Sequence, residues 1–131
     1  MDISHAREHA QAWVEAFNAH DLDAVMAFYA DDIELRSPLA ARAGATQGPL
    51  QGLGGDGVLK GKEAVRKFFA LGLANPKLQF ELVDVLVGVR AITVLYRNQA
   101  GVLVADNEEF DADGRIVRMT ACYGAAADRS K

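Results

Sequence analysis

The feature that most constrains the fold is a run of four β-rich segments in the second half of the chain. Valine, isoleucine, leucine and aromatic residues are concentrated at residues 78–87, 91–98, 102–110 and 115–123. Only short, glycine-containing turns separate these segments. A parallel crossover needs about a dozen residues or more, whereas turns this short join antiparallel neighbours. We therefore expect an antiparallel meander.

The first half of the chain predicts helices and one short strand. Apolar residues recur every three or four positions over 3–17, 22–29 and 63–73, which is the spacing of a helix with one buried face. Residues 33–37 predict a strand that ends at Pro38, because proline has no amide hydrogen for a β ladder. Helices followed by a meander indicate the α+β class. We expect about three helices packed on the concave face of a curved antiparallel sheet.

Residues 39–61 differ from both halves, because seven glycines lie between Gly44 and Gly61, with Pro49 among them. Such a segment has high backbone entropy and little apolar surface to offset it. We interpret it as a glycine-rich flap over a cavity. Residues 52–57 also spell G-x-G-x-x-G, but a dinucleotide site needs a strand before this motif and a helix directly after it. We therefore interpret the match as chance.

Length and charge exclude several classes of protein. A chain of 131 residues is expected to form a single domain over 1–131. Its net charge of -4 lacks the basic excess that nucleic-acid binding requires. No run of about 18 apolar residues occurs, so we expect no membrane segment and a cytoplasmic location. Cys122, the sole cysteine, cannot form an internal disulfide, and we expect a small packed thiol.

His5 and His9 stand at the ends of the pattern H-x-x-E-H, in which two histidines one helical turn apart bind zinc. No third ligand supports this motif in the sequence, and a helix at a chain terminus frays. We predict a solvated helix start here, no metal site and no cofactor.

The segment 102–110 carries the most informative pattern. Period-two alternation places one set of residues on a single face: Val102, Val104, Asp106, Glu108 and Phe110. Two carboxyl groups thus interrupt an apolar row. In a dry hollow, desolvation would raise the pKa of Asp106 and let it donate a hydrogen bond or move a proton at neutral pH. The alternatives are that this face is wet, or that Asp106 pairs with Arg97 or Arg118.

Aromatic residues on the predicted helices and strands are available to wall such a hollow, although at helical spacing they are more often simple core. Ser37, at the end of the first predicted strand, could also face inward. We take as candidate substrate-binding residues Trp13, Phe17, Tyr29, Ser37, Phe69, Val104, Met119 and Tyr123.

Four stretches of the chain carry a resemblance to a known family: WVEAFNAHDLD at 13–23, FYADDI at 28–33, GKEAV at 61–65 and FDADGRI at 110–116. They resemble the nuclear-transport-factor-2-like superfamily, in particular its SnoaL-like and ketosteroid-isomerase-like members. The resemblance implies a cone-shaped α+β barrel with a deep apolar pocket, and a homodimer that forms through the outer face of the sheet.

The resemblance also assigns roles to single residues. By its spacing before the FDADGRI turn, Asp106 corresponds to the oxyanion-hole aspartic acid of ketosteroid isomerase, a neutral acid that donates a hydrogen bond. The position of that family's general base is Ser37 here, the tyrosine on its first helix is Trp13, and a second pocket tyrosine is Phe69. Because a serine hydroxyl is far too weak a base, the sequence argues against ordinary ketosteroid isomerisation.

Two functional hypotheses follow from the sequence. The first is an isomerase- or cyclase-type enzyme that performs acid/base chemistry on a small apolar carbonyl compound, such as a steroid- or polyketide-like molecule. Asp106 and Glu108 would be its catalytic groups, with Tyr29, Tyr96 and Asn98 as orienting groups. The alternative is a non-catalytic domain of the same fold that binds a small ligand or dimerises.

Overall fold

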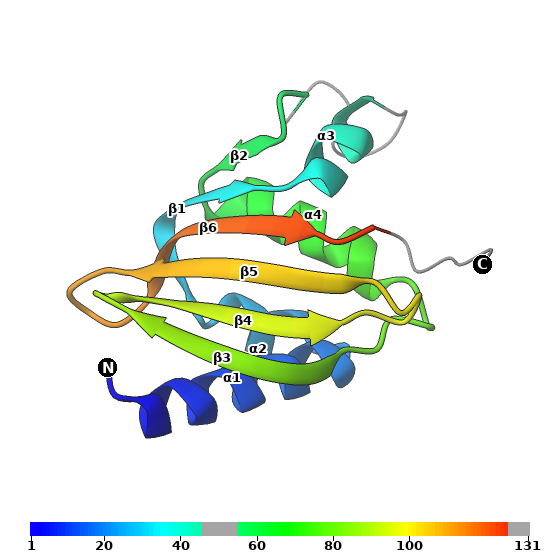
Figure 1. Ribbon diagram of the computed structural model, residues 1–131. Coiled ribbons are helices and arrows are strands. Elements are labelled where there is room, and N and C mark those ends of the chain that lie inside the picture. Colours follow the sequence, from blue (N-terminus) through cyan, green and yellow to red (C-terminus); the bar gives the residue numbers. More distant parts are fainter. Residues whose placement is uncertain (46–54, 126–131) are drawn as a thin grey trace.

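The computed structural model describes residues 1–45 and 55–125 (Figure 1). Its helices are α1 (Ile3–Asn18), α2 (Leu22–Met26), α3 (Pro38–Ala45) and α4 (Lys62–Leu73). Its strands are β1 (Tyr29–Arg36), β2 (Val58–Lys60), β3 (Glu81–Gly88), β4 (Ala91–Arg97), β5 (Leu103–Phe110) and β6 (Ile116–Tyr123). Helices followed by a meander confirm the α+β class.

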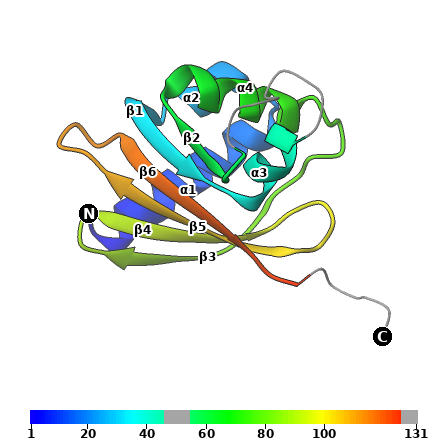
Figure 2. The ribbon, with the colours of Figure 1, turned by 90° about the horizontal axis from the view of Figure 1, so that it is seen from above.

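The strands form one curved, six-stranded sheet in the order β2-β1-β6-β5-β4-β3 (Figures 1 and 2). The meander β3–β6 is antiparallel throughout, as the short turns predict. A wholly antiparallel sheet is wrong, because β1 pairs with β6 in parallel, with Leu35 opposite Met119. The chain between these two strands is long enough for a parallel crossover, which local turn lengths in the meander do not reveal.

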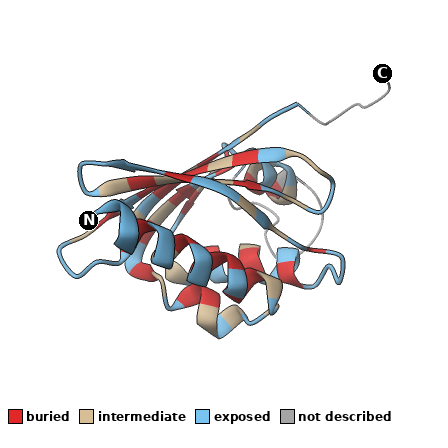
Figure 3. Ribbon diagram, turned by 60° about the horizontal axis from the view of Figure 1, so that its bottom comes forward, coloured by how far each residue is buried: buried red, intermediate tan, exposed pale blue. Residues whose placement is uncertain are grey.

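Helices α1, α2 and α4 lie on the concave side of the sheet (Figures 1 and 3), and each buries apolar residues there. The backbone N–H of His5 donates to the carboxylate of Asp2, which caps α1. Asp21 caps α2 in the same way. The predicted second helix is too long, since α2 ends at Met26 and Tyr29 already belongs to β1. The buried face of α1 comprises Ala6, Ala10, Trp13, Val14, Ala16 and Phe17.

Where the structure describes residues 39–61, the segment contains α3 and β2, so it is not irregular there, whereas its role as a flap over the cavity stays a prediction. Pro38 occupies the first turn of α3, where its fixed φ suits a helix and its missing N–H costs nothing. The Ser37 Oγ accepts the Leu39 N–H at 3.1 Å and closes the helix start. Gly57 adopts a φ of 85° at the entry to β2. Half of the G-x-G-x-x-G match, residues 52–54, lies outside the described residues.

The outer face of the meander carries Cys122, which is exposed. The expectation of a packed thiol is therefore wrong: β6 alternates, Ala121 points inward, and no described element covers the opposite face. None of the described helices is long and apolar enough to cross a membrane.

Candidate functional site

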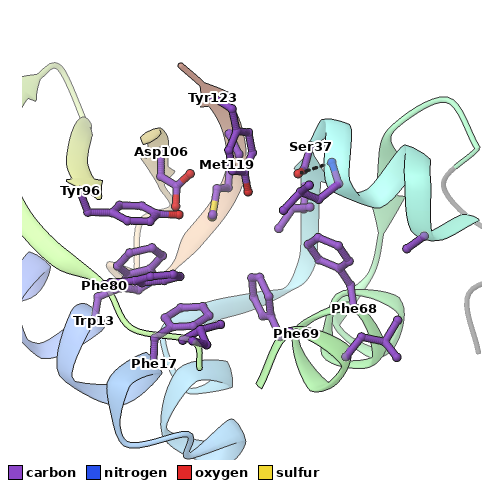
Figure 4. Close-up of a pocket in the computed structure, with 17 residues that line it drawn as sticks. Trp13, Phe17, Ser37, Phe68, Phe69, Phe80, Tyr96, Asp106, Met119 and Tyr123 are labelled. Atoms are coloured by element: carbon purple, nitrogen blue, oxygen red, sulfur yellow. Dashed lines mark hydrogen bonds between the residues drawn. The ribbon is translucent and has the colours of Figure 1, made fainter. Parts of the chain in front are cut away.

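A cavity of about 150 Å³ lies between the helices and the concave face of the sheet (Figure 4). It is lined by seven of the predicted site residues: Trp13, Phe17, Ser37, Phe69, Asp106, Met119 and Tyr123. Three others, Tyr29, Val104 and Glu108, are fully buried but do not line it. The residues predicted from separate elements thus largely meet in one place, whereas their chemical roles stay predictions.

Asp106 is 1% exposed on β5, and its side chain points into the cavity (Figure 4). By hydrogen-bond geometry neither carboxyl oxygen has a partner among the described residues, although the Tyr96 hydroxyl is close enough to act on this carboxyl. Burial raises the pKa of Asp106 well above its ordinary value, the negative charge of Glu108 raises it further, and the nearby Tyr96 hydroxyl opposes the rise. A buried carboxyl with no cation beside it is stable only as the neutral acid.

The predicted alternatives for Asp106 are wrong. Its face of β5 is dry. Arg118 lies on the other face of the sheet, where it donates to Glu109 at 3.1 Å. Arg97 donates to the carbonyl of Gly101 at 3.4 Å, in the β4–β5 turn.

Two phenol groups accompany Asp106 at the cavity. Tyr96 on β4 is 4% exposed, and its hydroxyl points toward the Asp106 carboxyl (Figure 4). Burial, together with this carboxyl, raises the pKa of Tyr96 well above its ordinary value, so that the phenol keeps its proton. Burial raises the pKa of Tyr123 to about 12, with Ser37 and Arg42 opposing the rise. Both tyrosines are therefore hydrogen-bond donors at neutral pH.

The rest of the wall is apolar and aromatic. Phe80 precedes β3, and its ring lies 4.3 Å from that of Tyr96 and 5.9 Å from that of Trp13, measured between centroids. Phe80 is a wall residue that was not predicted from the sequence, although its place at the start of a β-rich segment that follows a helix could have indicated it. Leu39 and Leu71 complete the rim; they are 36% and 41% exposed.

Two predicted groups serve the fold instead of the cavity. The Trp13 indole N–H donates to the Tyr29 hydroxyl at 2.9 Å, and that hydroxyl donates to the Met119 sulfur at 3.5 Å. Tyr29 thus fixes two wall residues from behind. Asn98, predicted to orient substrate, caps the β4–β5 turn, where its side-chain oxygen accepts the Ala100 N–H at 3.0 Å.

Glu108 lies two residues beyond Asp106, outside the cavity. Its Oε1 is 2.9 Å from Nε2 of His9, and Glu108 is 0% exposed. Burial raises its pKa, and His9 opposes this rise.

His5 is exposed as predicted for a solvated helix start, whereas for His9 that prediction is wrong, because it is packed against the sheet. The described residues contain no cluster of histidine, cysteine or carboxylate side chains that could hold a metal.

The fold and cavity define a class: α+β proteins with an apolar pocket between a curved mixed sheet and its covering helices. Within this class, residues 10–123 match the family model of the SnoaL-like domain. The chain belongs to the SnoaL-like family.

Solved structures agree with this assignment. A SnoaL-like protein of unknown function from Burkholderia thailandensis is 32% identical, with a TM-score of 0.84, over 95% of this chain and 98% of the other. An epoxide hydrolase/cyclase-like enzyme of pyran ring formation in the polyether salinomycin is 16% identical, with a TM-score of 0.71, over 95% and 94%. An NTF2-like protein of unknown function from Cytophaga hutchinsonii is 9% identical, with a TM-score of 0.67, over 91% and 89%. The last two likenesses show the fold alone.

Proposed function

We propose that this SnoaL-like protein is an enzyme that moves protons on a small apolar carbonyl compound, with Asp106 as its catalytic acid. The observation that carries the proposal is the Asp106 carboxyl itself, which lines the cavity, is 1% exposed and has both oxygens unpartnered. A buried polar group without partners destabilises a fold, so such a group needs an explanation beyond packing. A carbonyl oxygen held in the cavity would supply the missing partner.

Because both oxygens of Asp106 are available to the substrate, this carboxyl can also act as the base that Ser37 does not provide. The protonated oxygen of Asp106 donates its proton to the substrate carbonyl oxygen, while its other oxygen accepts a proton from the adjacent carbon. The C–H electron pair becomes the C=C bond of an enol, and the carboxyl ends the step protonated as it began. If the substrate is an enone, this enol is a dienol: the carboxyl then protonates its far carbon, the enol O–H returns its proton to the other carboxyl oxygen as the C=O bond re-forms, and the product is the isomeric enone. One neutral carboxyl therefore acts as acid and base in turn, with the Tyr96 phenol positioned to orient the carbonyl oxygen.

The size of the cavity narrows the substrate class. An apolar cavity of about 150 Å³ binds one benzene ring, and the cavity here has the same volume, about 150 Å³. We propose a single-ring carbonyl compound in place of the steroid-like molecule that the family resemblance suggests. The exposed Leu39 and Leu71 at the rim favour an apolar substituent on that ring at the mouth.

The experiment is an exchange assay in D₂O. Single-ring ketones and enones, with a four-ring steroid ketone as size control, are incubated with the protein, and deuterium uptake beside the carbonyl is followed by NMR. We expect exchange of the single-ring compounds, and a loss of at least about 100-fold in its rate in Asp106→Asn. Glu109→Gln, which removes an exposed carboxyl from the outer face of the same strand, is the matched control and keeps the full rate.

Three outcomes would contradict this proposal. Full exchange by Asp106→Asn removes this residue from the chemistry. Equal exchange of the steroid ketone contradicts the size limit. A compound that binds to the wild-type protein without exchange favours the alternative function, a non-catalytic ligand-binding domain, for which the serine in place of a general base is the supporting observation.

We also propose that the chain forms a homodimer through the outer face of the meander. The β-ladder register places Leu95, Ala105 and Cys122 in one row across β4, β5 and β6. Leu86 and Leu103 add exposed apolar surface, at 53% and 38% exposure. Several exposed apolar side chains on one face make that face a candidate interaction site.

A further inference from the structure

A second carboxyl, Glu108, is buried as deeply as Asp106 and takes no part in the proposed chemistry. It is 0% exposed and does not line the cavity. Its Oε1 lies 2.9 Å from Nε2 of His9, and its Oε2 has no hydrogen-bond partner among the described residues. The chain thus keeps two acids on one strand face, of which only one faces the cavity.

His9 is held in place for this contact. Its ring packs edge-on against Phe28 and Phe110, with centroids 5.3 and 5.2 Å away. The histidine side chain is 14% exposed, whereas that of Glu108 is 0% exposed. His9 therefore lies between the buried carboxyl and solvent, where its ring can pass a proton from one to the other.

The two carboxyls have opposite surroundings. Glu108 has His9 on α1 as a donor, and a buried carboxylate needs such a partner. Among the described residues, the titratable groups that interact with Asp106 carry no positive charge: they are the phenols of Tyr29 on β1, Tyr96 on β4 and Tyr123 on β6, and Glu108 itself. Residues two apart on one strand face are roughly 7 Å apart. At that distance in the interior, charging one carboxyl strongly opposes charging the other.

We propose that His9 is a positioning residue: it holds the one negative charge of this buried pair on Glu108 and thereby keeps the proton on Asp106, where the cavity needs it. With Glu108 ionised, Nε2 of His9 carries the proton and donates it to Oε1. The significance of this charge placement rests on the proposed function, which requires a neutral Asp106. The placement itself is measurable in the protein without any substrate.

The test follows the ¹³C resonances of the aspartate and glutamate carboxyls by NMR as the pH is varied. In the wild-type protein we expect Glu108 to ionise at lower pH than Asp106. In Glu108→Gln the Asp106 midpoint moves to lower pH, because the repelling charge is gone. In His9→Gln the Glu108 midpoint moves to higher pH. The controls are Glu109→Gln and His5→Gln, which change exposed groups next to each position and leave both midpoints unchanged.

Three results would overturn the proposal: ionisation of Asp106 before Glu108 in the wild-type protein, an unchanged Asp106 midpoint in Glu108→Gln, or an unchanged Glu108 midpoint in His9→Gln. The order in which Glu108 and Asp106 ionise in the wild-type protein tests the proposal even if one of the variants does not fold. This titration uses no substrate, so it can fail independently of the proposed function. If the proposed function alone is wrong, the titration gives the expected midpoints while the D₂O assay shows no deuterium exchange. Loss of packing alone lowers stability without moving these midpoints.

Discussion

Glu108 and Glu109 are neighbours on β5, yet they lie on opposite faces of the sheet. Each contacts one cationic or potentially cationic side chain at nearly the same distance, 2.9 Å to His9 and 3.1 Å to Arg118. The side chain of Glu108 is 0% exposed, and that of Glu109 is 51% exposed. Two pairs that look alike by distance therefore differ almost entirely in their contact with water.

This difference decides what each pair does for the molecule. Water screens the Glu109–Arg118 pair, so it adds little to stability and places no constraint on nearby charges. Glu108 is 0% exposed, so bulk water does not screen its charge, which raises the pKa of Asp106. A short contact distance alone does not show whether a pair affects stability or nearby charges. The face of the strand decides this, because it determines whether the pair is buried.

The largest expected effect comes from removing His9 and Arg118, the partners of the two glutamates, in turn. His9→Ala leaves a buried carboxyl without its donor and removes packing against Phe28 and Phe110, so we expect a loss of about 3 kcal/mol in the free energy of unfolding. Arg118→Ala removes a screened partner, and we expect a loss below about 0.5 kcal/mol. Urea unfolding at one pH measures both. Equal losses in the free energy of unfolding for the two variants would contradict the proposed difference between the two faces of the sheet.

A smaller effect concerns the pH dependence of stability. Burial raises the pKa of Asp106 in the folded state, so the folded chain binds this proton more tightly than the unfolded chain does. The stabilisation is complete below the unfolded pKa of about 4 and is lost as the pH rises toward the folded pKa. The slope for one such group is at most about 1.4 kcal/mol per pH unit.

Asp106→Asn removes this contribution, so between about pH 5 and 8 its free energy of unfolding falls less steeply than that of the wild-type protein. Urea unfolding across this range gives both curves. The matched control, Glu109→Gln, changes an exposed carboxyl and keeps the wild-type slope. Parallel curves for Asp106→Asn and the wild type would show that Asp106 is not buried in solution.

The buried row of β5 was predictable, because it depends only on the two-residue period of a strand. Val104, Asp106, Glu108 and Phe110 are all buried, as the alternation indicates. The same applies to the meander, whose short turns allow only antiparallel pairing. Local periodicity therefore yields which side chains share a face.

The partners of those side chains were not predictable in this way. His9 and Glu108 are 99 positions apart, and their contact depends on how α1 crosses the sheet. The parallel pairing of β1 with β6 likewise arises from packing between distant segments. The volume of the cavity depends on how large aromatic residues such as Phe80 fill the space, and periodicity carries no information on this.

The smallest expected effect lies at Cys122, on the same outer face as Glu109. Cys122→Ser changes an exposed side chain, and we expect the free energy of unfolding to change by no more than about 0.5 kcal/mol, as measured by urea unfolding.

The thiol nevertheless reports on the proposed homodimer. If two copies bury this face, Cys122 reacts with a water-soluble disulfide reagent more slowly as the protein concentration rises. Leu95→Arg, two strands away in the same row, abolishes that dependence. A reaction rate of the wild-type protein that does not depend on concentration, together with a monomer in analytical ultracentrifugation, would contradict the homodimer and show that the outer face is in contact with water. Dimerisation would instead make its core as dry as the inner face and confine the screened pairs, such as Glu109–Arg118, to its rim.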